Sequence, residues 1–378
     1  MFIPVQIVRG GSSKGLVVHR DVLPPPGEAR DAVVLRLFGS PDRRQIDGLG
    51  GADKLTSKLA VIGAPSLEGC DIDYHFAQVG IADPLVDWSA NCGNIAAAVA
   101  LIGAQQGFGV RTAEGKARVV IHKVNVGRRL IAEVPMDGDH PARTGDFAIG
   151  GVPGTGPRID LDFADLAGCM LERGLFPTGA LCQTVELASG ERLPVSIIDL
   201  ANLHGVVLDS DIGLDLAAGP GDLDAQTQVV ARLEALRVAV AQQAGLYAGE
   251  DVAAATATRN NPLIHVVSTR RPGGEVDMEA RSFTRGTFSK AFPVSGAFAC
   301  AAAARVSGTI LASLPHAQPA AGRTAYAIRH ATGIVRCDVA IADRSAVSEV
   351  LSARMGRTAR ILMSGEAILE PLSEAGAK

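Results

Sequence analysis

Aromatic side chains are scarce in this sequence of 378 residues, since phenylalanine, tyrosine and tryptophan together make up only 4%. A basic excess is missing too, because 36 Lys and Arg residues face 40 Asp and Glu residues. Proteins that bind nucleic acids usually carry a basic stripe and aromatic rings that stack on bases. We therefore expect no nucleic-acid partner. The apolar share of 47% also argues against a chain that is mainly disordered.

Long hydrophobic runs are absent as well. The longest nearly apolar run spans residues 296–304, whereas a membrane-spanning helix needs about 20 residues. The first residues lack the basic flank and apolar stretch of a signal peptide. Six cysteines are scattered without a CxxC pair, which excludes a disulfide scaffold and a zinc finger. We expect no membrane contact and a reduced, cytoplasmic location.

Common nucleotide and metal motifs are not found. Residues 10–15 read GGSSKG, which is not the order of a Walker A loop, and no GxGxxG or HExxH motif occurs. The eight histidines are scattered, so a metal site is not favoured. The sequence therefore predicts a protein without a cofactor or a metal ion.

The hydrophobic patterns predict short strands and a few helices along the chain. The length favours two domains, and the turn signal at 176–179 places a boundary near residue 180. We predict helices over 29–38, 94–103, 163–171, 222–243 and 295–306, and loops over 10–15 and 39–53. Strands are expected over 3–8, 16–19, 57–63, 71–79, 118–122, 129–134, 183–187, 193–199, 205–208, 264–268 and 277–283.

Two segments resemble each other. The run that begins Cys92-Gly93-Asn94 and the run that begins Ser295-Gly296-Ala297 each place a polar residue and a glycine before a helix of small side chains. One interpretation is that they are two unrelated buried helices of an alanine-rich chain. The other is that the protein has two similar halves, each offering a helix N-terminus to a shared cleft.

Cys92 and Lys58 are the candidates for chemistry. Cys92 stands where a helix should begin, and the unpaired N–H groups there stabilise a thiolate and bind carboxylates. Asn91 and Asn94 add amide donors, although a buried cysteine before a helix can also be inert. Lys58 opens an apolar strand, where burial would lower its pKa and make it a usable base. The alternative is that Lys58 extends its amine from the end of the strand into solvent.

The segment 10–15 is a further candidate, because its consecutive N–H groups and hydroxyls resemble an anion-binding nest. Its side chains are Ser12, Ser13 and Lys14. The alternative is a polar hairpin tip that binds no ligand.

Several motifs in order resemble the PrpF and methylitaconate Δ-isomerase family, which includes 4-oxalomesaconate tautomerases. The resemblance covers most of the chain and rests on residues 9–15, 39–42, 45–48, 50–53, 55–58, 91–94, 151–155, 176–179 and 357–360, together with Asp87. It implies a diaminopimelate-epimerase-like α/β (α+β) fold with two similar halves. Each half would wrap a mixed, barrel-like sheet around a central helix, with the active site in the cleft between them. The domains would be 1–180 and 181–355, with the tail 356–378 packing back on the first.

The resemblance also implies a cofactor-independent isomerase that moves a C=C bond by a 1,3 proton transfer. Lys58 and Cys92 occupy the positions of the catalytic pair, with Lys58 as base and Cys92 as acid or the reverse. The substrate would be a small di- or tricarboxylate of the methylitaconate, methylaconitate, aconitate or 4-oxalomesaconate type. We expect it to be bound by Ser12, Ser13, Lys14, Asn91, Gly93, Asn94, Ser295, Gly296 and Ala297.

Two other functions stay open at this point. A racemase or epimerase of an amino or hydroxy acid would need a second acid or base, and the second helix offers only Ser295. A non-catalytic protein that binds a polycarboxylate is the other. The sequence departs from the family at Ser289, His204 and His330, which leaves the substrate open. A second copy of the chain, in a homodimer, is the macromolecular partner that we expect.

Overall fold

The computed structural model describes residues 1–318, 324–342 and 349–370. In these residues, twenty strands form one continuous mixed sheet. The N-terminal strands are β1 (Phe2–Gly10), β2 (Ser13–His19), β3 (Lys58–Gly63), β4 (Ile72–Val79), β5 (Val86–Asp87), β6 (Val110–Arg111), β7 (Lys116–Lys123), β8 (Arg128–Asp137), β9 (His140–Pro141) and β10 (Ile159–Asp162). The helices among them are α1 (Glu28–Phe38) and α2 (Gly93–Gln105).

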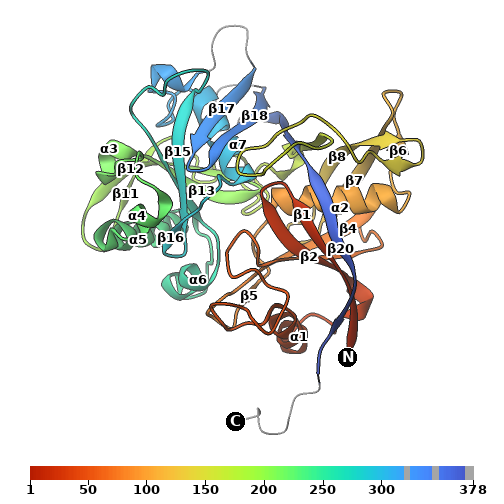
Figure 1. Ribbon diagram of the computed structural model, residues 1–378. Helices are drawn as coiled ribbons and strands as arrows, with labels where there is room; N and C mark the ends of the chain where they lie inside the picture. The colour runs from red at the N-terminus through yellow and green to blue at the C-terminus, as the bar shows by residue number, and fades with distance from the viewer. Residues whose placement is uncertain (319–323, 343–348, 371–378) are drawn as a thin grey trace.

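The C-terminal elements follow the same mixed pattern (Figure 1). The strands are β11 (Gln183–Glu186), β12 (Arg192–Leu200), β13 (Asn202–Leu208), β14 (Leu263–Val267), β15 (Met278–Thr284), β16 (Thr287–Phe288), β17 (Ala325–His330), β18 (Gly333–Ile341), β19 (Val350–Arg357) and β20 (Ala359–Ile368). The helices are α3 (Asp209–Ile212), α4 (Pro220–Asp224), α5 (Thr227–Ala244), α6 (Val252–Thr258) and α7 (Val294–Arg305).

The strands pair in two runs, and the two runs are joined at one edge of each. The first run is β20-β1-β2-β3-β4-β7-β8-β10, with parallel pairs at β2–β3 and β4–β7. The second is β19-β18-β17-β15-β14-β13-β12-β11, with parallel pairs at β15–β17 and β13–β14. Pairing of β10 with β19 joins the two runs into one sheet.

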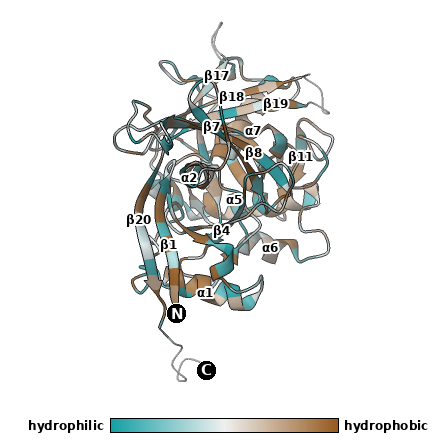
Figure 2. Ribbon diagram, turned by 90° about the vertical axis from the view of Figure 1, so that its right-hand side faces the viewer, coloured by the Kyte–Doolittle hydropathy of each residue, from teal (hydrophilic) through white to brown (hydrophobic). Residues whose placement is uncertain are grey.

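Each run curls around one buried helix. Figure 2 looks along α2 and shows β1, β4, β7, β8 and β20 around it. Helix α7 packs against β12, β13, β14 and β18, and it also contacts α2. Alanines fill both helices on all sides, which lets the strands approach closely, and a helix that is apolar all round belongs in a core. The predicted fold, with a barrel-like mixed sheet around a central helix in each half, is therefore confirmed.

The first and last strands, β1 and β20, pair beside α2. Strand β20 lies antiparallel to β1, with Phe2 opposite Ile368 and Gly10 opposite Ala359. This pairing carries the segment that follows β19 back to the N-terminal strands. As a result, Arg357 and Thr358 lie next to the β1–β2 turn, where Arg9 Nη1 donates a hydrogen bond to Thr358 Oγ1 at 2.9 Å. The division at residue 180 stays a prediction.

Three expectations about local structure were wrong. The predicted helix 163–171 is only a short 3-10 turn, Ala164–Leu166, because the Asp199 carboxylate accepts the backbone N–H groups of Met170 and Leu171. The predicted helix 222–243 is broken into α4 and α5, and Asp224 accepts the N–H of Phe288 instead of continuing a helix. The predicted loop 10–15 is a two-residue turn, since β1 and β2 already pair at Gly10 and Ser13.

No helix in the described part of the chain combines the length and the hydrophobicity that crossing a membrane requires.

Candidate functional site

A cavity of about 100 Å³, which we call the central cavity, lies where the N-termini of α2 and α7 meet. Both runs of the sheet contribute to its walls. Its lining consists of Ser13, Lys54, Leu55, Lys58, Phe76, Gln78, Ala90, Asn91, Cys92, Gly93, Asn94, Asn202, Asn260, Leu263, Thr284, Ser289, Ala291, Phe292, Pro293, Val294 and Ser295. A larger cavity of about 360 Å³ shares Ala291 and Phe292 with it, but neither Lys58 nor Cys92 lines that one. We therefore place the candidate site in the central cavity.

Lys58 is held in place by the strand register. It opens β3 between Gly15 of β2 and Gln78 of β4, and the residue is 9% exposed. Its Nζ donates a hydrogen bond of 2.7 Å to Gln78 Oε1 and lies 5.3 Å from the centroid of the Phe76 ring. The Gln78 amide is itself fixed, because its Nε2 donates to the Ser57 carbonyl at 2.9 Å. A neutral acceptor, not a carboxylate, thus faces the Lys58 amine.

Cys92 is the N-cap of α2 and is 8% exposed. Its side chain makes no capping hydrogen bond, while its carbonyl accepts the Ala96 N–H and the Tyr74 hydroxyl, the latter at 3.2 Å. The N–H groups of the first turn have no partner inside a helix, so a partial positive charge gathers there. The thiol therefore lies at the electropositive end of the helix, on the wall of the cavity.

Two buried basic side chains lie near this end of α2. Lys123 Nζ lies 3.4 Å from the centroid of the Tyr74 ring and has no hydrogen-bond acceptor among the described residues. Burial lowers the pKa of Lys123 to about 7, and the charge of Cys92 opposes this shift. Arg357 Nε donates to Asn94 Oδ1 at 3.0 Å, and burial lowers the pKa of Arg357 to about 10. Both side chains lie close enough to Cys92 to interact with it electrostatically.

An asparagine bridge joins the two helix starts. Asn202 Nδ2 donates to Ser295 Oγ at 3.0 Å, and Asn202 Oδ1 accepts the Asn91 N–H at 3.1 Å. Cys92 caps α2 from outside the helix, whereas Ser295 is the second residue of α7. The repeat seen in the sequence is therefore offset by two residues, although both side chains line the same cavity.

Of the two serines at the β1–β2 hairpin, one reaches the central cavity. Ser13 lines it, and its buried Oγ has no hydrogen-bond partner among the described residues. Ser12 lines the larger cavity instead and accepts a hydrogen bond of 3.2 Å from Asn94 Nδ2. Lys14 lines neither. Gly11 has a φ of +52°, and a Cβ there would come within 2.1 Å of Asn94 Oδ1, so the turn requires glycine.

Of the predicted site residues, the central cavity brings together Lys58, Cys92, Ser13, Asn91, Gly93, Asn94 and Ser295. Gly296 and Ala297 lie deeper in α7, outside its lining. A Cβ on Gly296 would meet the His265 ring at 2.5 Å, so this glycine serves close packing. His265 in turn shares a hydrogen bond of 2.8 Å with the buried His204.

Sequence reasoning missed Lys54, Gln78 and Asn202. The pairing of β3 with β4 would have pointed to Gln78, which is opposite Lys58, but no local pattern marks the other two. Of the positions that depart from the family, Ser289 lines the central cavity and His330 the larger one. Burial, with Arg281 and Arg357 nearby, lowers the pKa of His330 to about 4.

The lining as a whole suits an anion. It contains two lysines, a thiol, several amides and hydroxyls, and two helix N-termini, but no Asp or Glu. The described residues contain no group of three or more His, Cys, Asp or Glu side chains that could hold a metal ion. Fixed N–H donors and cations in a cavity of this kind can bind carboxylates and stabilise negative charge that develops during a reaction.

Comparison with known proteins supports this interpretation. A 3-methylitaconate isomerase from Eubacterium barkeri is 35% identical over 381 residues, which cover 98% of each chain. A (4E)-oxalomesaconate Delta-isomerase from Novosphingobium sp. is 36% identical over 362 residues, which cover 96% of each chain. A solved methylitaconate-delta-isomerase structure matches with a TM-score of 0.76 and 34% identity, covering 97% of this chain and 95% of that one.

The fold extends to more distant proteins. A hydroxyproline epimerase from Agrobacterium vitis matches with a TM-score of 0.60 over 99% of this chain and 93% of its own, at 12% identity. That likeness concerns the fold alone. Residues 1–370 match the family described as PrpF protein, and the chain therefore belongs to the PrpF family.

Proposed function

We propose that this protein is an isomerase that moves a C=C bond within a small unsaturated di- or tricarboxylate by a 1,3 proton shift. The observation that carries the proposal is the placement of Lys58 and Cys92 on the wall of one cavity whose lining has cations and N–H donors but no carboxylate. Membership of the PrpF family and the isomerase activity named for its relatives support the same conclusion.

The chemistry needs one base, one acid and a place for negative charge. A base removes a proton from the carbon next to the double bond, and the electron pair of that C–H bond spreads over the alkene and a carboxylate as a dienolate. Protonation at the far carbon then completes the shift. We assign Lys58 as the base and Cys92 as the acid. The N–H groups at the starts of α2 and α7 would stabilise the dienolate.

This mechanism consumes no redox equivalents and uses no cofactor. One proton leaves one carbon and one is added at another, so the substrate and product have the same composition. Acid and base work best when their pKa values lie near the working pH. Lys58 Nζ lies between Gln78 Oε1 and the Phe76 ring, and Cys92 lies at the N-terminus of α2.

An epimerase is the less favoured alternative. It would need an acid or base on the α7 side, opposite Cys92. Ser295 stands there, and its hydroxyl accepts a hydrogen bond from Asn202. A protein that only binds a polycarboxylate would not need Lys58 and Cys92 as an acid and base pair.

A proton-NMR assay in deuterated water tests the proposal. The wild-type protein is incubated with 3-methylitaconate, 2-methylaconitate, aconitate and 4-oxalomesaconate, and the alkene signals are followed over time. We expect at least one double bond to move, with deuterium at the carbon that receives the proton. The Cys92→Ala variant should lose this activity by about 100- to 10,000-fold. Absence of turnover with all four compounds would refute the proposal.

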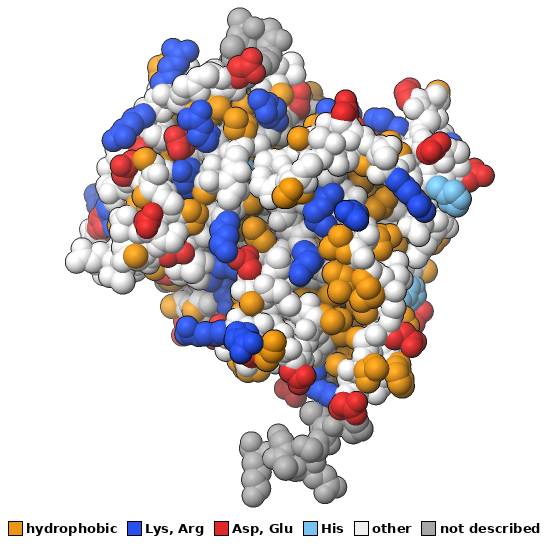
Figure 3. Space-filling view, in the orientation of Figure 1, with side chains coloured by type: hydrophobic (Ala, Val, Ile, Leu, Met, Phe, Trp, Pro, Cys, Tyr) orange, Lys and Arg blue, Asp and Glu red, His pale blue; other side chains and the backbone are white. Residues whose placement is uncertain are grey.

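A homodimer remains a prediction. Figure 3 shows hydrophobic side chains gathered over β1 and β20, and exposed apolar residues there are Phe2, Leu362, Met363 and Ile368. In the described residues β20 pairs only with β1, which leaves its other edge open to a strand of a second copy. Light scattering after gel filtration would measure the mass.

A cytoplasmic location is also a prediction. All six cysteines are free thiols, and the proposed role of Cys92 requires its reduced form.

A further inference from the structure

Lys54 is a second lysine of the central cavity to which the mechanism assigns no role. It precedes β3, yet its side chain reaches across to the C-terminal strands. Its Nζ donates hydrogen bonds to the carbonyls of Thr284, at 2.5 Å, and Thr287, at 3.3 Å. Thr284 also lines the cavity. An ammonium group has three N–H donors, so these two contacts leave one donor for a ligand.

The positive charge of Lys54 has no close counter-ion. Among the described residues, no carboxylate lies within ion-pair distance of its Nζ. The neighbouring Asp53 is bound to Lys290 at 2.6 Å, and Glu234 to Arg237 at 2.8 Å. Burial and the nearby charges of Arg285 and Arg237 lower the pKa of Lys54 to about 7, while Asp224 and Glu234 oppose this shift. An anionic ligand would supply the missing charge.

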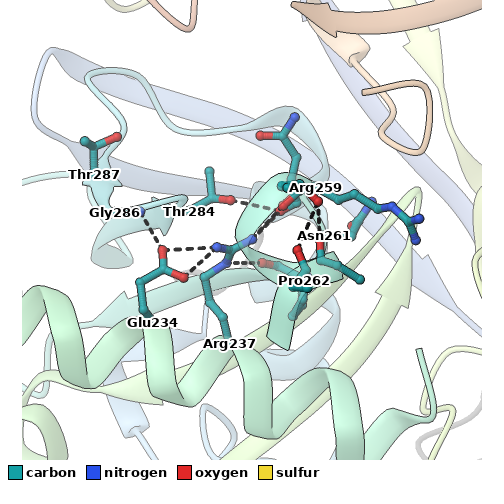
Figure 4. A network of polar contacts seen from close by, with 12 residues as sticks. Glu234, Arg237, Arg259, Asn261, Pro262, Thr284, Gly286 and Thr287 are labelled. Atoms are coloured by element: carbon teal, nitrogen blue, oxygen red, sulfur yellow. Dashed lines mark hydrogen bonds and ion pairs between the residues drawn. The ribbon is translucent and has the colours of Figure 1, made fainter. Parts of the chain in front are cut away.

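The turn that receives Lys54 is firmly anchored. Figure 4 shows Arg237 at its base, with Nε donating to the Pro262 carbonyl at 2.9 Å and Nη2 to the Arg259 carbonyl at 2.8 Å. Glu234 accepts the N–H of Gly286, and Thr284 Oγ1 donates to the Asn260 carbonyl at 2.9 Å. The Lys54 ammonium is therefore held in one place before a ligand binds, which reduces the entropy that binding would cost.

Three separate features of the cavity can each receive a carboxylate: the start of α2 at Gly93, the start of α7 at Ser295, and Lys54. We propose that Lys54 binds one carboxylate of a tricarboxylate substrate and makes this protein prefer tricarboxylates to dicarboxylates. This inference rests on the proposed isomerase function, because it concerns the substrate of the same cavity.

Two saturated analogues that differ by one carboxylate provide the test. Propane-1,2,3-tricarboxylate carries the additional group, and glutarate, propane-1,3-dicarboxylate, lacks it. Titration calorimetry at pH 7 measures the affinity of both for the full chain. We expect the wild type to bind the tricarboxylate roughly 10- to 100-fold more tightly, the contribution of a hydrogen bond to a charged group. Lys54→Met should remove this preference and leave the affinity for glutarate within about threefold.

Lys290→Met is the matched control. Lys290 carries the same charge in the same neighbourhood, but its side chain is 66% exposed and paired with Asp53, so the preference should persist without it. Lys54→Arg, which keeps the charge, should retain part of the preference. Equal affinity of the wild type for both analogues would overturn the inference, and so would an equal loss of both affinities in Lys54→Met, which indicates a purely structural contact.

The isomerisation assay separates the two proposals. If the protein isomerises a dicarboxylate but shows no tricarboxylate preference, the proposed function stands and the proposed role of Lys54 is refuted. If the protein shows the Lys54-dependent preference but isomerises none of the candidates, the binding role of Lys54 stands and the proposed function is refuted.

Discussion

Replacing Lys123 by methionine should stabilise the protein near neutral pH. Lys123 is 1% exposed, lies under the Tyr74 ring, and has no hydrogen-bond acceptor among the described residues. Burial without a partner disfavours the charged form, and it lowers the pKa of this lysine from 10.5 to about 7. Methionine has a similar length, is apolar, and packs favourably against aromatic rings.

The size of the effect follows from linkage. The unfolded chain holds the Lys123 proton up to about pH 10.5, whereas the folded protein releases it above about pH 7. Between these values the unfolded state binds more protons, so stability rises with pH. The penalty is largest below pH 7, where about 1.4 kcal/mol per pKa unit gives an upper bound of about 5 kcal/mol. Loss of the cation–π contact offsets roughly 1–2 kcal/mol of the gain.

Urea unfolding of both proteins at pH 6, 7, 8 and 9.5 measures this difference. The variant should be more stable at pH 6 and 7, and the difference should shrink as the pH approaches 9.5. Lys116→Met is the control, because Lys116 Nζ contacts Glu133 at 2.9 Å and Asp160 at 3.3 Å, which raise its pKa, and its loss should not stabilise the fold. A Lys123→Met variant that is less stable at every pH would refute the reasoning.

Three further predictions follow from the site. Limited alkylation near neutral pH, read by peptide mass mapping, should modify Cys92 first, and a bound polycarboxylate should protect it; earlier reaction of Cys300 with loss of activity would contradict this. Gly11→Ala should cost more stability in urea than Gly107→Ala, since both have positive φ but only Gly11 faces Asn94 within 2.1 Å; equal losses would contradict the packing argument. Treatment with a strong chelator should leave the isomerisation rate unchanged, and a metal-dependent recovery would contradict the mechanism.

The sequence predicts the parts of this fold that depend on local pattern. Helices α2 and α7 were predicted within two residues of their ends, because small apolar side chains on every face suit only a buried helix. The helix expected at 163–171 did not form, because Asp199, about 30 residues away, takes the N–H groups that a helix would use. Local periodicity contains no information about such a long-range partner.

The candidate site shows the same difference between residues in local motifs and residues placed by long-range contacts. Cys92 and Lys58 lie within motifs, and the structure places both in one cavity. Lys54 and Asn202 reach that cavity only through pairing of distant segments, with Lys54 bound to the Thr284 carbonyl and Asn202 to Ser295. Arg357 is brought to Asn94 by the return of the chain through β19 and β20. These contacts depend on topology, which a single sequence does not specify locally.

The central claim is that Lys58 and Cys92 transfer the proton while Ser295 only helps to bind the substrate. Steady-state kinetics of Lys58→Ala, Cys92→Ala and Ser295→Ala, with the substrate that the NMR assay identifies, test it most directly. The first two should lose about 100- to 10,000-fold in kcat while still binding substrate, and the double variant should be little worse than either. Ser295→Ala should mainly raise KM, by roughly 10- to 100-fold. Near-native turnover by Lys58→Ala together with an inactive Ser295→Ala would contradict the account.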